Sequence, residues 1–339
     1  MDLKLFQYKY PSELIAQHPL PERDASRMMV LSHAEKTWRH DGVKNLPQHL
    51  KEGDVLVLNN TRVFPARLIG DVRCPMSAER KVEILLLNEI AANRWKCLAK
   101  PFKKISLGDE VHFAADFSGT VTDKTDGFVT MEFHVENFEK SLEQIGLPPL
   151  PPYIKRKTAG DYSPEDKTRY QSVFAQQKGS AAAPTASLHF SPELLKEIQN
   201  RGVKIAYVTL HVSTDTFLPI REDDVTQHKM HGESFVVPPE TQEIVQKAKT
   251  EGRRVIAVGT TAARALESDW NQTSTEIFIY PGYHFKIIDG LLTNFHQPSS
   301  TLLLLVSALA GREFVLQSYA EAIKERYRLF SYGDCMLIT

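Results

Sequence analysis

Four polar residues, Asn59-Asn60-Thr61-Arg62, directly follow an apolar run at 55–58 that is typical of a buried strand. Polar groups at the carboxyl end of a parallel strand lie at the edge of the sheet where α/β proteins bind their ligands. A guanidinium binds a carboxylate or a phosphate through two hydrogen bonds, so Arg62 is a candidate anion-binding residue, with Asn60 beside it. A polar turn with asparagine caps is the alternative interpretation.

Residues 179–190 form a second candidate, because small residues there are followed by His189 and Phe190 just before a helix start. Small residues let the backbone approach a flat ligand, an aromatic ring can stack on a base, and an imidazole can move a proton near neutral pH. The alternative is a flexible loop that contains a hydrogen-bonded histidine.

Gly259, Thr260 and Thr261 lie where the apolar strand 255–258 turns into a helix. The free N–H groups and the dipole of a helix start attract an anionic group. The segment is not GxGxxG and no Walker lysine follows, which disfavours dinucleotide and ATP binding. Structural capping alone remains the other interpretation.

The C-terminal half is rich in histidine, with His189, His211, His228, His231, His284 and His296. His228 and His231 are spaced like metal ligands but lack the helical HExxH pattern, so we predict no metal site. Asn294 and His296 end a predicted strand and would face the same sheet edge as Gly259. The segment 330–334 adds the Asp334 carboxylate.

Basic residues cluster at Lys155, Arg156 and Lys157, and again at 100–104 and 324–328. The 41 basic and 42 acidic side chains nearly cancel, which argues against indiscriminate binding to polyanions, so a nucleic acid would have to bind at a local basic patch. Each cluster is equally compatible with an ordinary solvated face.

Helical and strand patterns alternate through the C-terminal half. Caps, glycines and periodicity predict helices at 191–198, 238–252, 262–268 and 300–310, and strands at 203–212, 255–258, 277–280 and 291–295. This alternation predicts an α/β layered domain with a largely parallel sheet.

The region 63–151 has a different pattern. Short β-rich runs lie at 66–72, 82–87, 95–99, 110–113, 119–121 and 129–133. Such spacing favours a small barrel or sandwich. A proline-rich connector at 146–152 follows, so we predict an inserted all-β barrel-like domain at 63–151 within a discontinuous α/β domain formed by 1–62 and 152–339.

The 339 residues, 42% hydrophobic and 24% charged, have the composition of an ordinary globular protein. We expect no membrane span and no secretory signal, since the longest apolar stretch, 302–310, is short and the N-terminus has no basic and apolar leader. Cys74, Cys97 and Cys335 form no CxxC pair, which indicates a reducing, cytoplasmic location.

Motifs along nearly the whole chain resemble one family, the S-adenosylmethionine:tRNA ribosyltransferase-isomerases of queuosine biosynthesis. They are Pro21-Glu-Arg-Asp24, Leu58-Asn-Asn-Thr-Arg-Val63 with Pro65-Ala-Arg67, Leu147-Pro-Pro-Leu-Pro-Pro-Tyr153, Ala183-Pro-Thr-Ala186, Leu188-His-Phe190, Val208-Thr-Leu-His211, Val258-Gly-Thr-Thr261, Ile279-Tyr-Pro-Gly-Tyr283, Thr293-Asn-Phe-His296, Pro298 with Ser300-Thr301, and Phe330-Ser-Tyr-Gly-Asp334. The chain departs from the family pattern at Ser187, usually glycine, and at 213–216, usually glycine-rich.

The resemblance implies an α/β domain interrupted by a β-barrel, and a reaction in which S-adenosylmethionine is a substrate rather than a cofactor. Its ribosyl part would move to the aminomethyl group of 7-aminomethyl-7-deazaguanine at the wobble position of tRNA with a GUN anticodon. Isomerisation would give an epoxycyclopentanediol, and adenine and methionine would leave. No cofactor is expected, and we expect a monomer.

The resemblance also implies roles for matched residues. Proton carriers would be His189, His211 and His296, with Asp334 as a second-choice base. Substrate contacts would come from Asn60, Arg62, Thr185, Phe190, Gly259, Thr260, Thr261, Tyr280 and Asn294, with Arg62 clamping the methionine carboxylate. Lys155, Arg156 and Lys157 would grip the tRNA.

Three rival functions make different predictions. An S-adenosylmethionine-dependent RNA methyltransferase would release S-adenosylhomocysteine and would carry a glycine-rich loop after its first strand. A non-catalytic tRNA-binding module would release no adenine. A metal-dependent hydrolase built on His228 and His231 would lose activity on chelation.

Overall fold

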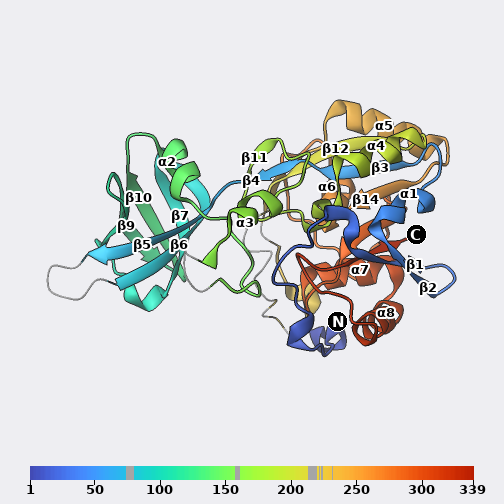
Figure 1. Cartoon of the computed structure of the whole chain (residues 1–339), viewed down its shortest axis with the longest axis horizontal. Helices are drawn as coiled ribbons and strands as arrows, with labels where there is room; N and C mark the ends of the chain where they lie inside the picture. The colour runs from blue at the N-terminus through green and yellow to red at the C-terminus, as the bar shows by residue number, and fades with distance from the viewer. Residues whose placement is uncertain (74–79, 157–160, 213–219, 221, 223, 231) are drawn as a thin grey trace.

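The chain folds into a small closed barrel and a large sheet flanked by helices, at opposite ends of the molecule (Figure 1). The structure, a computed structural model, describes residues 1–73, 80–156, 161–212, 220, 222, 224–230 and 232–339. Segments from both ends of the chain build the large sheet, because its strands come from residues before and after the barrel.

The large sheet has nine strands among the described residues. Their order is β15 (Ser274–Thr275), β13 (Glu233–Val236), β12 (Lys204–Leu210), β3 (Val55–Asn59), β14 (Val255–Val258), β16 (Gly290–Asn294), β17 (Cys335–Ile338), β1 (Arg27–Ser32) and β2 (Thr37–Gly42). Within the described chain, the pairs β12–β3, β3–β14, β14–β16 and β17–β1 are parallel and the other four are antiparallel. The expectation of a largely parallel sheet is therefore corrected to a mixed sheet.

Two of the four antiparallel pairs follow from how their strands are connected. β1 and β2 form a hairpin, which needs no crossover helix. Two consecutive helices, α7 and α8, precede β17, and the chain returns antiparallel to β16. The predicted strand at 277–280 is wrong: these described residues pair with no strand, and Ile279 packs in the core without a ladder.

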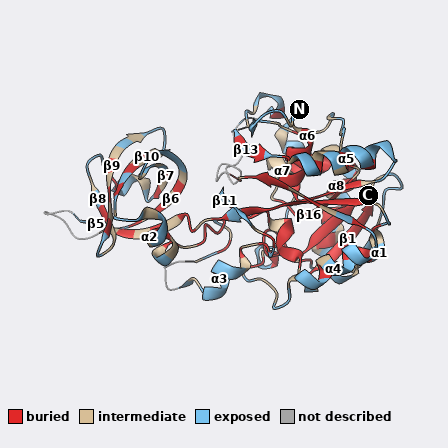
Figure 2. Cartoon of the chain, turned by 90° about the horizontal axis from the view of Figure 1, so that it is seen from above, coloured by how far each residue is buried: buried red, intermediate tan, exposed pale blue. Residues whose placement is uncertain are grey.

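Strand side chains of the large sheet alternate between two cores. Val55 and Val57 pack in one core together with α5 (Pro239–Thr250), α6 (Thr260–Glu267), α7 (Thr301–Ala310) and α8 (Arg312–Lys324). Leu56 and Leu58 pack in the other, together with α1 (Leu46–His49) and α4 (Pro192–Asn200). Helices thus cover both faces, and the strands between them are buried (Figure 2).

The predicted helices of the C-terminal half are confirmed, and two of them begin at serine caps. The Ser191 side chain accepts from the Leu194 N–H at the start of α4, and Ser300 does the same for Leu303 at the start of α7. Short 3₁₀ helices occur at Leu3–Phe6, Ser12–Leu14, Arg23–Ala25 (η3), Val43–Asn45, Phe102–Lys104, Thr185–His189 (η7) and Val225–Gln227. The sequence analysis did not predict α8 or the strands β1, β2 and β17.

The six β-rich runs form the closed antiparallel barrel. Its strands are β5 (Arg67–Arg73), β6 (Arg80–Ala91), β7 (Arg94–Lys100), β8 (Glu110–Ala114), β9 (Phe117–Thr125) and β10 (Phe128–His134). Leu68, Ile84 and Val129 belong to a core of its own, against which Leu142 of α2 (Phe138–Ile145) packs. The barrel strands lie inside the predicted insertion; the domain boundaries themselves stay a prediction.

The connection between barrel and sheet is built from short elements. β4 (Thr61–Val63) pairs in parallel with β11 (Gln177–Ser180), and α3 (Pro164–Arg169) lies beside them between the two parts (Figure 1). No single helix among the described residues is long and apolar enough to cross a membrane. The pair α7–α8 passes that test only jointly and is bent by 112°.

Candidate functional site

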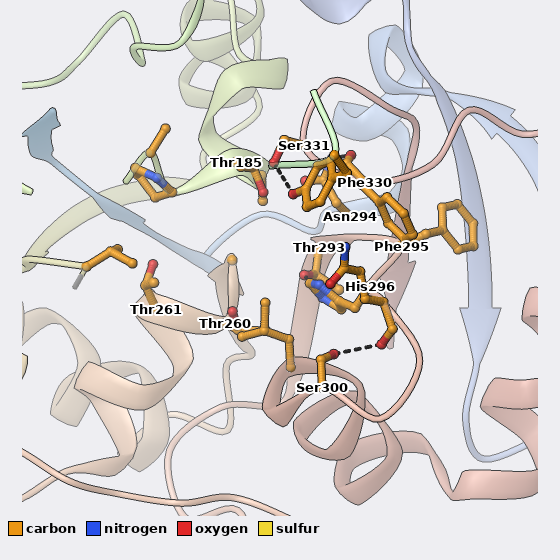
Figure 3. Close-up of a pocket in the computed structure, with 18 residues that line it drawn as sticks. Thr185, Thr260, Thr261, Thr293, Asn294, Phe295, His296, Ser300, Phe330 and Ser331 are labelled. Carbon is orange, nitrogen blue, oxygen red and sulfur yellow. Dashed lines mark hydrogen bonds between the residues drawn. The ribbon is translucent and has the colours of Figure 1, made fainter. Parts of the chain in front are cut away.

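A pocket opens at the carboxyl edge of β14 and β16. Six predicted residues line it: Thr185, Gly259, Thr260, Thr261, Asn294 and His296. Thr260 and Thr261 stand on one side, and Asn294 and His296 on the other (Figure 3). Among the described lining residues there is no lysine, arginine, aspartate or glutamate, so the wall carries dipoles rather than formal charges.

The start of α6 contributes backbone N–H groups to this pocket. Gly259 has φ +86°, a conformation that glycine adopts without strain. In the described chain no side chain caps α6, which leaves its first-turn N–H groups to a ligand or water. The Thr261 hydroxyl accepts from Asn59 Nδ2 at 3.1 Å, which fixes this turn to β3.

His296 is the imidazole that lines the pocket. The ring Nε2 lies 2.9 Å from Thr293 Oγ1. The backbone N–H of His296 donates to the Tyr319 hydroxyl oxygen at 3.0 Å, and its backbone carbonyl accepts from the Tyr8 hydroxyl. Burial lowers the pKa of His296 to about 3. The ring is therefore neutral at physiological pH and does not repel a cationic ligand.

Asn294 connects the pocket with His189. Its Nδ2 donates to the Phe330 carbonyl at 3.0 Å and to His189 Nε2 at 3.3 Å, so the neutral His189 carries its hydrogen on Nδ1. Burial lowers the pKa of His189 to about 4. Phe330, whose carbonyl Asn294 holds, has φ +69°, a strained value for a bulky residue in a pocket wall.

Asp334 supports the site from behind. Its carboxylate accepts from the N–H groups of Arg27 at 2.9 Å and Arg328 at 2.8 Å. Burial raises the pKa of Asp334, and these two hydrogen bonds oppose that effect. Asp334 does not line the pocket, so the geometry makes it a positioning residue that joins β1 to the turn at 328–334.

Other predicted site residues lie away from the pocket. Phe190 is fully buried against Phe174 and cannot stack on a base in this arrangement, which corrects that expectation. Asn60 Oδ1 accepts from the Thr209 hydroxyl at 2.6 Å. Arg62 is exposed beside another hollow and cannot clamp a carboxylate in this pocket, and Tyr280 packs near Phe278.

His211 lines the cleft between the barrel and the large sheet. Its Nδ1 lies 2.7 Å from the Thr61 hydroxyl, and burial lowers its pKa. The ring packs on Gly179, where an added Cβ would come within 2.9 Å of it. His211 therefore does not share a pocket with His296.

The basic cluster is only partly available to RNA. Arg156 forms a two-point ion pair with Asp166, at 2.9 and 2.8 Å, and its side chain is 4% exposed. The expectation that Arg156 grips tRNA is corrected, because its guanidinium already binds a carboxylate. Lys155 is exposed, and Lys157 lies outside the described residues.

Sequence reasoning missed several wall residues. Tyr153, Thr293, Ser300, Phe330 and Ser331 also line the pocket. All five lie in motifs on which the resemblance rests, and Ser300 also caps α7, so position in a motif was the available signal. No group of three or more potential metal ligands occurs in the part of the chain that the structure describes, which omits His231.

Comparison with known proteins gives one consistent result. The family model for queuosine biosynthesis protein matches residues 3–338. Two similar curated proteins are named S-adenosylmethionine:tRNA ribosyltransferase-isomerase. That of Desulforamulus reducens is 49% identical and that of Halothermothrix orenii 47% identical, each over 100% of both chains.

A solved structure is also similar. The crystal structure of S-adenosylmethionine tRNA ribosyltransferase from Thermotoga maritima is 34% identical, with a TM-score of 0.56, and the match covers 99% of this chain and 100% of that one.

Proposed function

Since the chain belongs to the queuosine biosynthesis protein family, that of the S-adenosylmethionine:tRNA ribosyltransferase-isomerases, we propose that it moves the ribosyl part of S-adenosylmethionine onto tRNA. The acceptor is the aminomethyl group of 7-aminomethyl-7-deazaguanine at the wobble position of a GUN anticodon. The products are epoxyqueuosine-tRNA, adenine and methionine. S-adenosylmethionine is a substrate here, and no cofactor enters the proposal; a cytoplasmic, monomeric enzyme stays a prediction.

The observation that carries the proposal is the uncharged pocket at the carboxyl edge of β14 and β16. A sulfonium cation in it meets a neutral His296 and no formal positive charge among the described lining residues. The uncapped N–H groups at the start of α6 suit the methionine carboxylate. Hydroxyls of Thr185 and Thr260 suit the ribose.

The chemistry requires at least two protons to move, one from the carbon beside the sulfonium and one that the amine loses to solvent as its new C–N bond forms. The sulfonium acidifies the neighbouring carbon, and a base must take that proton; adenine leaves more easily when it receives one. His296 is the imidazole that lines the pocket, and its pKa of about 3 leaves the ring neutral with a lone pair that can accept the proton; because this also makes it a weak base, the acidity of the carbon beside the sulfonium must drive the transfer. The same low pKa makes the imidazolium a strong acid, so the proton passes on to the departing adenine. The attacking amine must be neutral.

The test combines purified protein, S-adenosylmethionine and tRNA carrying 7-aminomethyl-7-deazaguanine, with mass spectrometry of small molecules and digested nucleosides. Equal amounts of adenine and methionine, with an epoxycyclopentane-bearing nucleoside, are expected. S-adenosylhomocysteine would instead mean methyl transfer, and tRNA binding without adenine would mean a binding module.

The role of His296 is tested by single-turnover kinetics of His296→Ala. We expect the rate to fall about 100-fold or more, the usual contribution of a general base. His134→Ala, which removes an exposed imidazole on the barrel, is the matched control. A His296→Ala rate equal to that of the wild type removes His296 as the proton carrier.

A further inference from the structure

A hollow next to the pocket gathers arginines that the reaction does not use. Arg23 of η3, Arg169 of α3 and Tyr332 line this arginine hollow, and Ser331 lines both it and the pocket. Arg23 also lines the neighbouring hollow that holds Arg62 of β4. α3 and β4 lie between the barrel and the large sheet (Figure 1).

Two buried donors in the arginine hollow have no hydrogen-bond partner among the described residues. They are the Arg169 Nε–H and the Tyr332 hydroxyl, and Tyr332 is only 5% exposed. A buried donor without an acceptor costs roughly 1–3 kcal/mol, so such groups call for a ligand. Because an N–H and an O–H both donate here, the missing ligand is one that accepts hydrogen bonds.

The positive charge of the hollow is only partly neutralised within the described chain. Arg23 donates only to carbonyls, those of Thr168 at 3.0 Å and Leu188 at 3.4 Å. Arg169 donates to the Pro21 carbonyl at 2.8 Å, and its nearest carboxylate is that of Glu165, at 3.5 Å. Burial and the like charge of Arg169 lower the pKa of Arg23.

Besides Glu165, two carboxylates lie near this charge, and each of these two has another cation. Glu22, in the arginine hollow, pairs with Lys44 at 2.5 Å. Glu143, in the hollow of Arg62, lies 3.9 Å from Lys178. For Arg62 no side-chain hydrogen bond or ion pair is present within the described part of the chain, and its guanidinium is exposed.

We infer that Arg23, Arg62 and Arg169 bind backbone phosphates of the tRNA beside the nucleotide whose base enters the pocket. Phosphate oxygens only accept hydrogen bonds, and a guanidinium binds them at two points. A base withdrawn from its stack for chemistry leaves its own phosphates at the mouth of the pocket. Ser331, shared by pocket and hollow, gives that adjacency. The inference rests on the proposed function, and it gives Arg23, the arginine of the 21–24 motif, a role in binding phosphate.

The experiment measures the affinity of the full-length protein for an anticodon-arm RNA transcript at several salt concentrations. Arg23→Gln, Arg62→Gln and Arg169→Gln are each expected to weaken binding about 5- to 30-fold and to reduce the salt slope by about one. Arg62→Gln removes no contact of the fold, so it keeps the test valid if the two partly buried arginines prove necessary for folding.

The matched control is Arg312→Gln at the start of α8, which removes an arginine outside both hollows. S-adenosylmethionine affinity, measured by calorimetry, is expected to stay unchanged in all four variants. The inference would be overturned if Arg62→Gln, together with each of Arg23→Gln and Arg169→Gln that folds, kept the RNA affinity and the salt slope of the wild type. Loss of S-adenosylmethionine binding with RNA binding intact would also overturn it. If the wild type binds both substrates but releases no adenine, the proposed reaction is wrong. The comparison of RNA affinities among the arginine variants still tests the phosphate-binding inference in that case.

Discussion

At the scale of residues, burial of two histidines makes stability depend on pH. Their native pKa values, about 4 for His189 and about 3 for His296, lie below the usual value near 6.5. Between these values the unfolded chain binds protons that the native chain does not, so stability falls as the pH falls below 6.5. At pH 5 each histidine lowers the free energy of unfolding by about 2 kcal/mol relative to pH 7.

Urea unfolding at pH 7 and pH 5 checks this expectation. His296→Gln removes the titrating ring, so its loss of stability on acidification is expected to be smaller than that of the wild type by about 2 kcal/mol. His134→Gln, a substitution at an exposed position on the barrel, is expected to lose as much stability between pH 7 and pH 5 as the wild type. Equal losses in the wild type and His296→Gln would contradict the assignment.

The second prediction at this scale concerns Arg156. The basic cluster 155–157 suggested that Arg156 binds tRNA, whereas its ion pair with Asp166 predicts a role in stability. Arg156→Met leaves the Asp166 carboxylate buried without its cation, which costs about 3 kcal/mol of stability. Chemical denaturation measures that cost, and Arg156→Met/Asp166→Leu should recover part of it. The salt slope of RNA binding is expected to stay the same; a slope reduced by one would restore Arg156 as a phosphate ligand.

At the scale of elements, the start of α6 links backbone geometry to substrate binding. Gly259→Ala places a Cβ on a residue with φ +86° and ψ +153°, a combination that essentially only glycine adopts, which costs about 1–3 kcal/mol, although the Cβ itself would meet only ordinary contacts at 3.6 Å and beyond. The strain is expected to move the first-turn N–H groups and to raise the KM for S-adenosylmethionine.

Gly252→Ala is the control for this element. Gly252 also has a positive φ, +68°, with open space around it, but it follows α5 and does not line the pocket. Thermal unfolding and steady-state kinetics compare the two variants. Equal KM values in both would show that the turn at 259 only terminates β14.

At the scale of the whole molecule, separate cores predict separate responses to substrate. The pocket residues all come from the large-sheet part, while the barrel packs around its own core. Hydrogen exchange with S-adenosylmethionine bound is expected to slow in α6 and β16 and to stay unchanged in β5 to β10. Equal slowing in the barrel would mean that the two parts respond as one unit.

Helices and strands that are specified by patterns among neighbouring residues could be predicted from the sequence. The six barrel strands lie within a few residues of the predicted runs because alternation and turn residues act between neighbours. Serine caps determined the starts of α4 and α7 for the same reason. Motif residues around 259–261 and 294–296 were also predicted to share a sheet edge, since consecutive parallel strands place their carboxyl ends together.

Contacts between residues that are far apart in the chain were not predictable from the sequence, because they depend on tertiary packing. Insertion of β17 between β16 and β1 adds one of the four antiparallel pairs of the mixed sheet, and its pairing with β1 depends on packing between the two ends of the chain. Phe330 rather than Phe190 lines the pocket, because a turn held by Asn294 places it there. Arg156 found Asp166, while Arg23 came to lie beside Arg169 without a carboxylate partner in the described chain. Such contacts depend on three-dimensional packing, and no local pattern of residues records them.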